Sequence, residues 1–201
     1  MLDLDSGRFH GVGAPSQGLS WGELAARLQQ DGRLGELHIE HDFLPASPSF
    51  PFGAHVAVVE VDTETGAVEL LRHVAVDDAG TLINPVVAAG QVHGGVATGI
   101  AQALFEEVVY DEDANLLTAN LVNYAFPSAA ELPSFEVVEM ETPTPLNALG
   151  AKGIGESGTI GATPAVQNAV LDALAPFGVR HIDMPVNGER VWRALQDASA
   201  Q

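Results

Sequence analysis

Cysteine is absent from the 201-residue sequence, and basic residues are scarce. Without a thiol the chain can form no disulfide, no thiolate zinc site and no iron–sulfur cluster of its own. Eight basic residues stand against 27 acidic ones, which gives a net charge of −19. Because such a charge repels phosphate backbones and anionic membranes at long range, the composition argues against nucleic acid as a partner.

The sequence also has little that looks like a targeting or membrane segment. Its first eight residues contain neither a basic region nor an apolar run, so we expect a cytoplasmic protein without membrane insertion. The longest uncharged stretch, residues 86–104, is interrupted by polar side chains and four glycines, which favours a buried helix. A hydrophobic fraction of 46% indicates a globular protein rather than a disordered one.

The N-terminal part predicts a leading segment and a capped helix. Residues 1–18 are rich in Gly, Ser and Pro, and we expect them to precede one domain over residues 19–201. Ser20 and Glu23 have the spacing of a capping box, in which each residue satisfies a free amide of the first helical turn. A helix is therefore predicted from this point to about Leu34.

The middle of the chain predicts a hairpin followed by a long helix. Two β-rich runs, residues 55–62 and 67–76, flank a short turn that contains glycine. The Asn84-Pro85 pair predicts a helix start, and the glycine-dotted helix is expected to reach Glu107. The density of glycines in this helix predicts close approach of another backbone or of a ligand, and tight helix packing explains most of them.

The C-terminal part predicts strands and two more helices, which gives an α+β fold with a mixed β-sheet and packed helices. Thr163 and Pro164 have the pattern of a cap followed by proline in the first turn, with an apolar run of helical period after them. A last capped helix is predicted after Asn187. Further strands are predicted at residues 106–110, 116–124 and 134–141.

A glycine-rich loop is the strongest candidate for chemistry, because five of the twelve residues from Gly150 to Gly161 are glycine. Exposed amides just before a helix suit phosphate oxygens or a flat polar cofactor. Lys152 is the only lysine of this acidic chain, which favours an anion contact over a solvated charge. Glu156 in the same loop is either a functional carboxylate or an exposed loop residue, and composition alone leaves both open.

The loop also contains a literal G-x-G-x-x-G match at residues 153–158. This pattern would indicate a nucleotide-binding dehydrogenase if a hydrophobic strand came immediately before it. The preceding residues 142–149 are punctuated by proline and lack strand alternation, so the context argues against that alternative.

Several longer strings of the sequence resemble those of a known protein family. In order they are DDAGTLINP at 77–85, GQVHGGVATGIAQAL at 90–104, NYAFP at 123–127, ETPTP at 141–145, GAKGIGESGTIGATPAVQNAVLDAL at 150–174, RHIDMP at 180–185 and ERVWRA at 189–194. From about Leu19 onward the sequence resembles the large, molybdopterin-binding subunits of molybdenum hydroxylases. This family includes xanthine dehydrogenase, aldehyde oxidase and CO dehydrogenase, and the likeness is nearest to the CO dehydrogenase branch.

The resemblance implies the C-terminal portion of the molybdenum-cofactor-binding domain and assigns roles to residues. Glu156 would be the general base beside the molybdenum, acting on a metal-bound hydroxide that oxidises CO, an aldehyde or an N-heterocycle. No protein ligand to the metal is expected, and His93 is left out of the metal set. The residues implied to bind the pterin or its phosphates are Gln91, Lys152, Gly153, Ile154, Gly155 and Ser157.

The resemblance also implies cofactors and partners that lie outside this chain. The expected cofactor is molybdopterin with molybdenum, in its cytosine dinucleotide form. Iron–sulfur clusters and FAD would belong to a small and a medium partner subunit. Because family large subunits are several times longer, the missing N-terminal part of the large subunit is a further expected partner. The alternative is a catalytically incomplete fragment or scaffold that needs a second chain.

Overall fold

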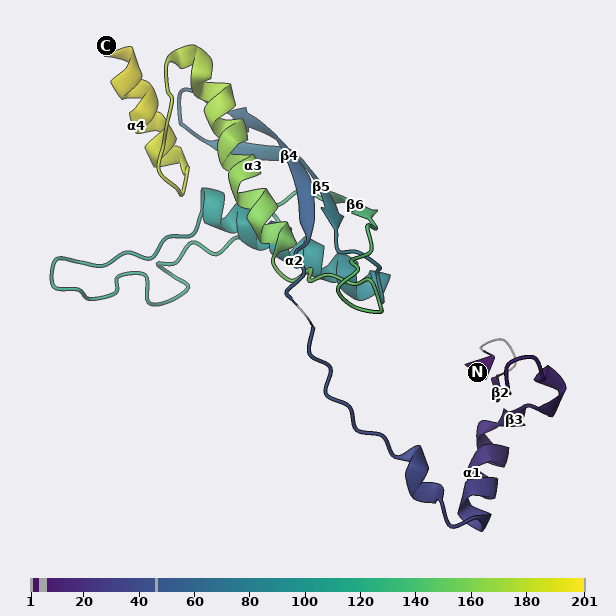
Figure 1. The fold of residues 1–201 in the computed structure, drawn as a ribbon. Coiled ribbons are helices and arrows are strands. Elements are labelled where there is room, and N and C mark those ends of the chain that lie inside the picture. Colours follow the sequence, from purple (N-terminus) through teal and green to yellow (C-terminus); the bar gives the residue numbers. More distant parts are fainter. Residues whose placement is uncertain (1, 4–6, 46, 201) are drawn as a thin grey trace. The chain divides into compact units, whose positions relative to one another are not determined.

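The computed structural model describes residues 2–3, 7–45 and 47–200, and the chain divides into the units Met1–Leu44 and Pro45–Gln201 (Figure 1). The elements of the first unit are the antiparallel strands β1 (Leu2–Asp3), β2 (Arg8–Phe9) and β3 (Leu19–Ser20), helix α1 (Trp21–Gln30) and the short 3-10 helices η1 (Pro15–Gln17) and η2 (Leu34–Leu37). The boundary predicted between residues 18 and 19 stays a prediction.

Helix α1 begins as the sequence predicts. The Ser20 amide donates to Glu23 Oε2 at 2.8 Å and the Glu23 amide donates to Ser20 Oγ at 3.3 Å, which confirms the capping box. The predicted end near Leu34 is wrong, because α1 stops at Gln30. Gly32 follows with a φ of +68°, and this left-handed conformation turns the chain out of the helix.

The second unit contains a mixed three-stranded sheet in the order β4-β5-β6. Strands β4 (Phe52–Val61) and β5 (Val68–Asp78) form the predicted hairpin, which confirms that prediction and extends it at the far ends. Strand β6 (Phe135–Met140) pairs with β5 in parallel, as the third predicted strand. The inward positions of β4 and β5 alternate with exposed ones, which is the pattern of a sheet covered on one face.

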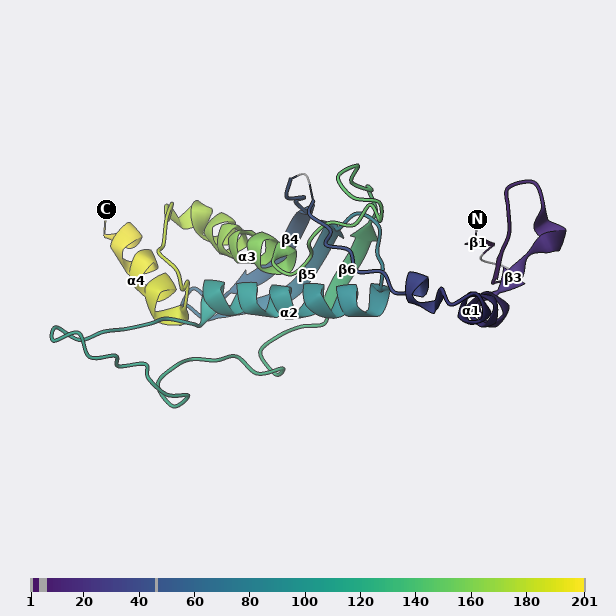
Figure 2. The same ribbon diagram turned by 60° about the horizontal axis from the view of Figure 1, so that its bottom comes forward.

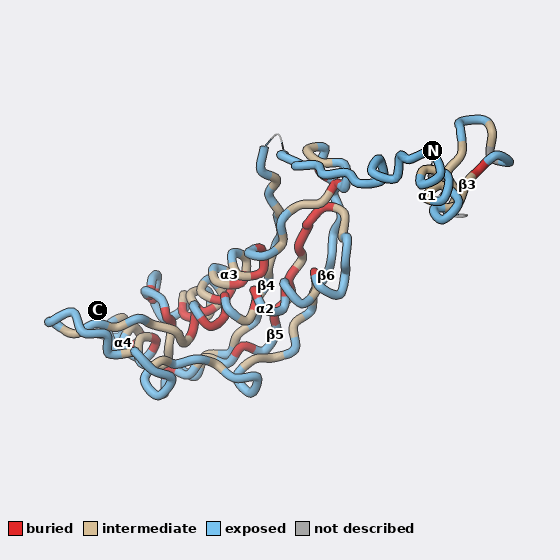
Figure 3. Tube along the Cα trace, turned by 90° about the horizontal axis from the view of Figure 1, so that it is seen from below, coloured by how far each residue is buried: buried red, intermediate tan, exposed pale blue. Residues whose placement is uncertain are grey.

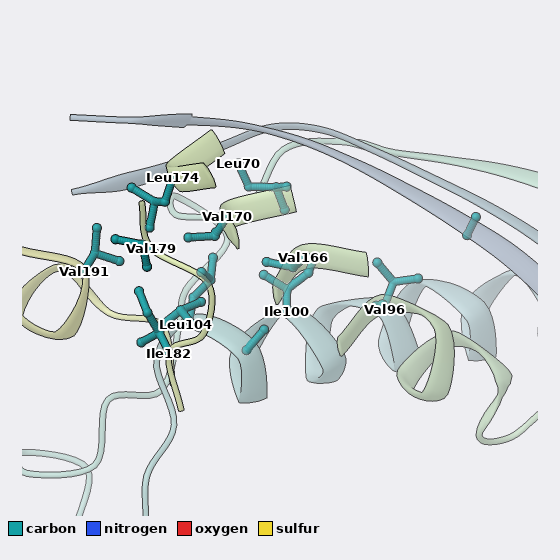
Figure 4. Packing of buried hydrophobic residues seen from close by; sticks show 14 of the residues in the cluster. Leu70, Val96, Ile100, Leu104, Val166, Val170, Leu174, Val179, Ile182 and Val191 are labelled. Atoms are coloured by element: carbon teal, nitrogen blue, oxygen red, sulfur yellow. The ribbon is translucent and has the colours of Figure 1, made fainter. Parts of the chain in front are cut away.

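Helices cover one face of this sheet. Helix α2 (Pro85–Leu104) and helix α3 (Ser157–Leu174) lie side by side against it, with the 3-10 turn η3 (Ala175–Phe177) and helix α4 (Gly188–Ser199) at one end (Figure 2). Their valines, leucines and isoleucines form one apolar core with the inner sheet residues (Figure 4). This arrangement confirms the predicted α+β fold with a mixed sheet and packed helices.

The long connection between α2 and β6 is irregular. Residues 105–134 include no buried residue, and in the second unit the tube in Figure 3 shows red buried segments on the helices and on the sheet. The strands predicted at 106–110 and 116–124 are wrong, because only one isolated bridge joins Tyr110 to Leu116. Without a neighbouring strand in the described part of the chain, their alternating residues have no ladder to join.

Two helix boundaries also differ from the predictions. Helix α2 ends at Leu104, before the predicted Glu107. Helix α3 begins at Ser157 rather than after Thr163, and Pro164 lies inside it. Contact with α2 extends α3 through glycines that would end an isolated helix. Among the described helices none is both long and apolar enough to cross a membrane.

Candidate functional site

The glycine-rich loop is fastened to the end of β5 by a buried carboxylate. Asp78 Oδ1 accepts hydrogen bonds from the amides of Gly80 at 2.9 Å and Thr142 at 3.0 Å, and from Lys152 Nζ at 3.0 Å. Burial by itself would raise the pKa of Asp78, but the hydrogen bonds from Thr142, Gly80 and Lys152 outweigh it and hold this pKa below its usual range. The carboxylate therefore stays charged and keeps its donors.

Lys152 is the loop's partner in this anchor. Its side chain is 9% exposed, its ammonium pairs with Asp78, and it lies 4.4 Å from the centroid of the Phe52 ring. Its own amide donates to Ala79 O at 2.8 Å. The lysine thus contacts an anion, as its isolation in the sequence indicated, and that anion is a carboxylate of this chain. A contact of Lys152 with a cofactor stays a prediction.

Beyond this anchor the loop presents free amides. In the part of the chain that the structure describes, the amides of Gly153, Ile154 and Gly155 have no hydrogen-bond acceptor. Gly153 and Gly155 are exposed, whereas the Ile154 side chain packs against the apolar core. Ser157 Oγ donates to Ile154 O at 3.2 Å and closes the turn from the protein side. The contacts of Lys152, Ile154 and Ser157 with the rest of the protein therefore fix the loop, while its three amides remain available to a ligand.

Helices α2 and α3 cross in backbone contact beside this loop. A Cβ placed on Gly158 would lie 2.7 Å from Val92 O and 2.9 Å from Val96 N, closer than real side chains come. Gly95 faces Gly158 from the other helix, and Thr159 Oγ1 donates to Gly95 O at 2.9 Å. No side chain fits at Gly95, Gly99 or Gly158, which confirms the predicted tight packing for two glycines of α2. For Gly90 and Gly94 that prediction is wrong, because nothing lies within 4 Å of an added Cβ.

This crossing lies next to the two main candidate residues in the sequence of each helix. Gln91 is adjacent to Val92, and Glu156 comes two residues before Gly158. Both side chains are exposed. Glu156 is the N-cap residue of α3, but its carboxylate makes no capping hydrogen bond. Glu156 and the free peptide amides of Gly153, Ile154 and Gly155 therefore lie just before α3, while Gln91 lies on α2 next to the residue that contacts Gly158.

His93 lies on α2, and its side chain has a packing role. Its exposed ring stacks on Phe135 of β6, with centroids 6.0 Å apart and planes 26° from parallel. Among the residues that the structure describes, no cluster of three or more His, Asp or Glu side chains could hold a metal ion. The polar groups next to Glu156 in the sequence are therefore backbone amides and its own carboxylate, not a set of metal ligands.

A buried polar network under the sheet face was missed by the sequence analysis. His55 Nε2 lies 3.2 Å from Asp77 Oδ2, and His73 Nε2 lies 3.2 Å from His55 Nδ1. Burial, with a smaller contribution from the charge of His55, lowers the pKa of His73 to about 4, against the opposing charge of Asp77. His55 and His73 are polar residues at inward positions of the predicted hairpin, and that placement was the available signal, whereas Asp77 lies just beyond the predicted second strand, in the part that β5 adds.

The G-x-G-x-x-G alternative lacks its structural context. The described strand that most closely precedes Gly153 is β6, which ends at Met140, and the residues between them form turns with one isolated bridge at Ala151. A dinucleotide fold needs a parallel strand running directly into the glycine turn. The glycine loop therefore does not have the geometry of a nucleotide-binding dehydrogenase.

Known proteins match the chain at family level. The family described as molybdopterin cofactor-binding domain matches residues 1–133. The carbon monoxide dehydrogenase large chain of Hydrogenophaga pseudoflava is 37% identical over 199 residues, which are 98% of this chain and 25% of that protein. The nicotine 6-hydroxylase large subunit of Paenarthrobacter nicotinovorans is 44% identical over 149 residues, 74% of this chain and 18% of that one.

A solved structure agrees with these sequence matches. CO dehydrogenase from Oligotropha carboxidovorans superposes with a TM-score of 0.88 at 35% identity, over 99% of this chain and 25% of that chain. The chain thus spans about a quarter of the length of the relatives that it matches. The glycine loop, the helix crossing and the sheet described above are part of that shared fold. The chain belongs to the molybdopterin cofactor-binding domain family.

Proposed function

We propose that the chain forms part of the large subunit of a molybdenum hydroxylase, with Glu156 as its general base. The observation that supports this proposal is the α2–α3 crossing, where the backbone of Gly158, two residues after Glu156, contacts Val92, the residue after Gln91. The family match supports the cofactor class, because it covers residues 1–133 under a molybdopterin description.

The residues around the start of α3 fit a pterin that carries phosphate groups. The free amides of Gly153, Ile154 and Gly155 are donors without acceptors, and they lie just before the positive end of a helix dipole. The amide side chain of Gln91 can both donate and accept without charge, as a pterin edge requires. When bound, the cofactor supplies Lewis-acid and two-electron redox chemistry.

Each of these residues then has a role in the proposed reaction. A carboxylate oxygen of Glu156 takes up the proton of the oxygen nucleophile, since the side chain is exposed and free of a capping hydrogen bond. Gln91 orients the pterin, and the amides of Gly153, Ile154 and Gly155 hold its phosphate side. Ser157 fixes the turn through Ile154 O, and Lys152 fixes the loop through Asp78. We assign the cytosine dinucleotide form of the cofactor to this site.

The complete enzyme needs further polypeptides. Because the chain spans about a quarter of its relatives, we propose that it assembles with the remaining part of a large subunit, an iron–sulfur small subunit and an FAD-binding medium subunit. Exposed apolar side chains in the connection before β6 support such an assembly, among them Leu121 at 80% and Val122 at 93% exposure. Carbon monoxide and N-heterocycles are the proposed substrate classes, after the names of the relatives, and aldehydes are a third class.

The proposal is tested in the assembled enzyme with one isosteric substitution. The chain is co-expressed with the polypeptides that complete the large subunit, and molybdenum content is measured before turnover with carbon monoxide, an aromatic aldehyde and quinoline. Glu156→Gln keeps the size of the side chain but removes the proton acceptor. We expect unchanged molybdenum content and turnover lowered by roughly 10³-fold or more, in the range of lost acid–base catalysis.

A matched control separates this effect from a general loss of charge. Glu112→Gln makes the same substitution at an exposed position of the connection, and it should leave turnover unchanged. Near-normal turnover of the Glu156→Gln enzyme would refute the assignment of the base. Absence of molybdenum from the wild-type complex would instead favour the scaffold alternative.

A further inference from the structure

The imidazole of His55 lies directly under the first turn of α3. A Cβ placed on Gly161 would lie 2.6 Å from the Cγ, Cδ2 and Nε2 atoms of this ring, so the helix backbone rests on the imidazole itself. We propose that His55, held by Asp77, is a positioning residue that fixes the start of α3 and, through it, the carboxylate of Glu156. This inference rests on the proposed function.

The contact with His55 is made by the same turn that Glu156 begins. The Ile160 amide donates to Glu156 O at 3.0 Å, and Gly161 is the next residue. A shift of the ring would therefore move the backbone of the turn that carries the Glu156 side chain. Ser157 and Ile160, together with His55 and Asp77, also line a cavity of about 90 Å³, so this side of the turn is loosely filled apart from the imidazole.

The ring of His55 is fixed by hydrogen bonds at both nitrogens. The side chains of His55 and Asp77 are 2% and 4% exposed, with Nε2 of His55 at 3.2 Å from Asp77 Oδ2. If that nitrogen carries the proton, Nδ1 accepts from His73 Nε2 at 3.2 Å. In this assignment His73 Nδ1, a buried nitrogen with no partner among the described residues, is unprotonated. The hydrogen-bond pattern thus orients the ring in one plane.

Helix α2 contacts the same part of α3 on a neighbouring side. Gly95 and Gly99 approach Gly158 and Thr159 there, and Thr163 Oγ1 donates to Gly99 O at 3.3 Å. The start of α3 therefore has two sets of close contacts, one with the backbone of α2 and one with the His55 ring. Two rigid contacts of this kind fix the orientation of the backbone that carries Glu156, and a general base needs a fixed orientation to reach its proton.

The first test measures the turn itself in the full 201-residue chain, without any cofactor. Amide hydrogen exchange of Ile160 reports on the hydrogen bond to Glu156 O, and that of Leu171 reports on the far half of α3. His55→Ala is expected to accelerate exchange at Ile160 by about tenfold and to leave Leu171 unchanged. His55→Gln, whose amide nitrogen can still donate to Asp77, should recover most of the protection.

Two further variants keep this test decisive. Val170→Ala removes buried volume from the far half of α3, so it should not accelerate Ile160 selectively. Gly161→Ala perturbs the same contact from the helix side and replaces His55→Ala if that variant does not fold. Exchange at Ile160 that stays at the wild-type rate, or acceleration that is equal at Leu171, would overturn the inference.

The second test connects the turn to catalysis in the assembled enzyme. His55→Ala is expected to lower kcat on the order of tenfold to a hundredfold with KM and molybdenum content unchanged, because a displaced base affects the chemical step more than binding. His55→Gln should restore kcat in proportion to the exchange protection. If Glu156→Gln proves fully active, the proposed function fails while the exchange result still stands. Unchanged kcat in His55→Ala would reject the positioning role alone.

Discussion

The α2–α3 crossing and the connection over residues 105–134 are neighbours in sequence, yet they behave in opposite ways. At the crossing, small residues such as Gly95 and Gly158 are buried in backbone contact. In the connection, large apolar residues such as Val122 and Phe126 are 93% and 69% exposed. Apolar character therefore does not decide burial by itself. A segment is buried when its surface matches that of a neighbour, and glycine supplies that match at the crossing.

The connection also shows what an unmatched segment looks like. Its apolar residues alternate well enough to predict strands, but no strand in the described part of the chain lies beside them. Large apolar side chains such as Leu121 and Val122 therefore stay exposed in this segment. The comparison therefore separates the part of the fold that this chain completes alone from the part that the proposed assembly would complete.

The largest effect is expected from adding a side chain at the α2–α3 crossing, and the difference between the crossing and the connection would disappear if the crossing tolerated it. Gly158→Val would place Cβ within 2.7 Å of Val92 O, so the helices have to separate. We expect a loss of about 3 kcal/mol in the free energy of unfolding, measured by urea denaturation. The matched control is Gly94→Ala, where nothing lies within 4 Å of the new atom, and it should stabilise α2 by up to about 1 kcal/mol. Equal effects of the two variants would contradict the proposed contact.

A second test of the difference between the two regions compares how a buried and an exposed carboxylate affect stability as the pH changes. The lowered pKa of Asp78 means that its contribution to stability is present above the unfolded value near pH 4 and is lost as the pH falls through the folded value. Between pH 6 and pH 2 the wild-type chain should therefore lose at least about 1 kcal/mol more than Asp78→Asn, measured by denaturant unfolding at each pH.

The control for this titration comes from the connection. Asn115 lowers the pKa of Asp111 through side-chain and backbone hydrogen bonds, but Asp111 is only partly covered on an exposed loop. Asp111→Asn should leave the pH dependence of unfolding as it is in the wild-type chain. A pH dependence that is the same for Asp78→Asn and the wild type would argue against the charged anchor.

The smallest effect is expected in the connection itself. Val122→Ser replaces a side chain that is 93% exposed, so the free energy of unfolding of the isolated chain should change by less than about 0.5 kcal/mol. Val96→Ala, at a fully buried position of α2, should cost roughly 2 kcal/mol in the same urea titration. A large loss at Val122 would show that the isolated chain does bury this segment.

Much of the fold follows from local patterns. The capping box at Ser20, the hairpin and the start of the helix at Pro85 are confirmed because caps, turns and alternation act over a few residues. The start of α3 was misplaced by seven residues, since contacts with α2 stabilise glycines that are poor helix formers. The strands expected in the connection failed for the opposite reason, because strands need a partner that local sequence does not provide.

The site shows the same division. The glycine loop and its single lysine were visible in the sequence, and the roles of Gln91 and Glu156 stay predictions drawn from family resemblance. The partner of Lys152 could not be predicted, because Asp78 lies 74 positions away and is brought near only by the sheet. Of the buried set of His55, His73 and Asp77, the two histidines carried a weak signal, as polar residues at inward strand positions.

The sequence by itself determined the family, the hairpin, the helix starts at Trp21 and Pro85, the glycine loop and the charge that disfavours polyanions. Only the tertiary structure decided which glycines are contacts, which carboxylate holds Lys152 and which ring supports the first turn of α3. The physical reason is range. Caps, turns and periodicity are set by neighbours along the chain, whereas close packing and buried ion pairs depend on surfaces that meet only after the sheet and helices have assembled.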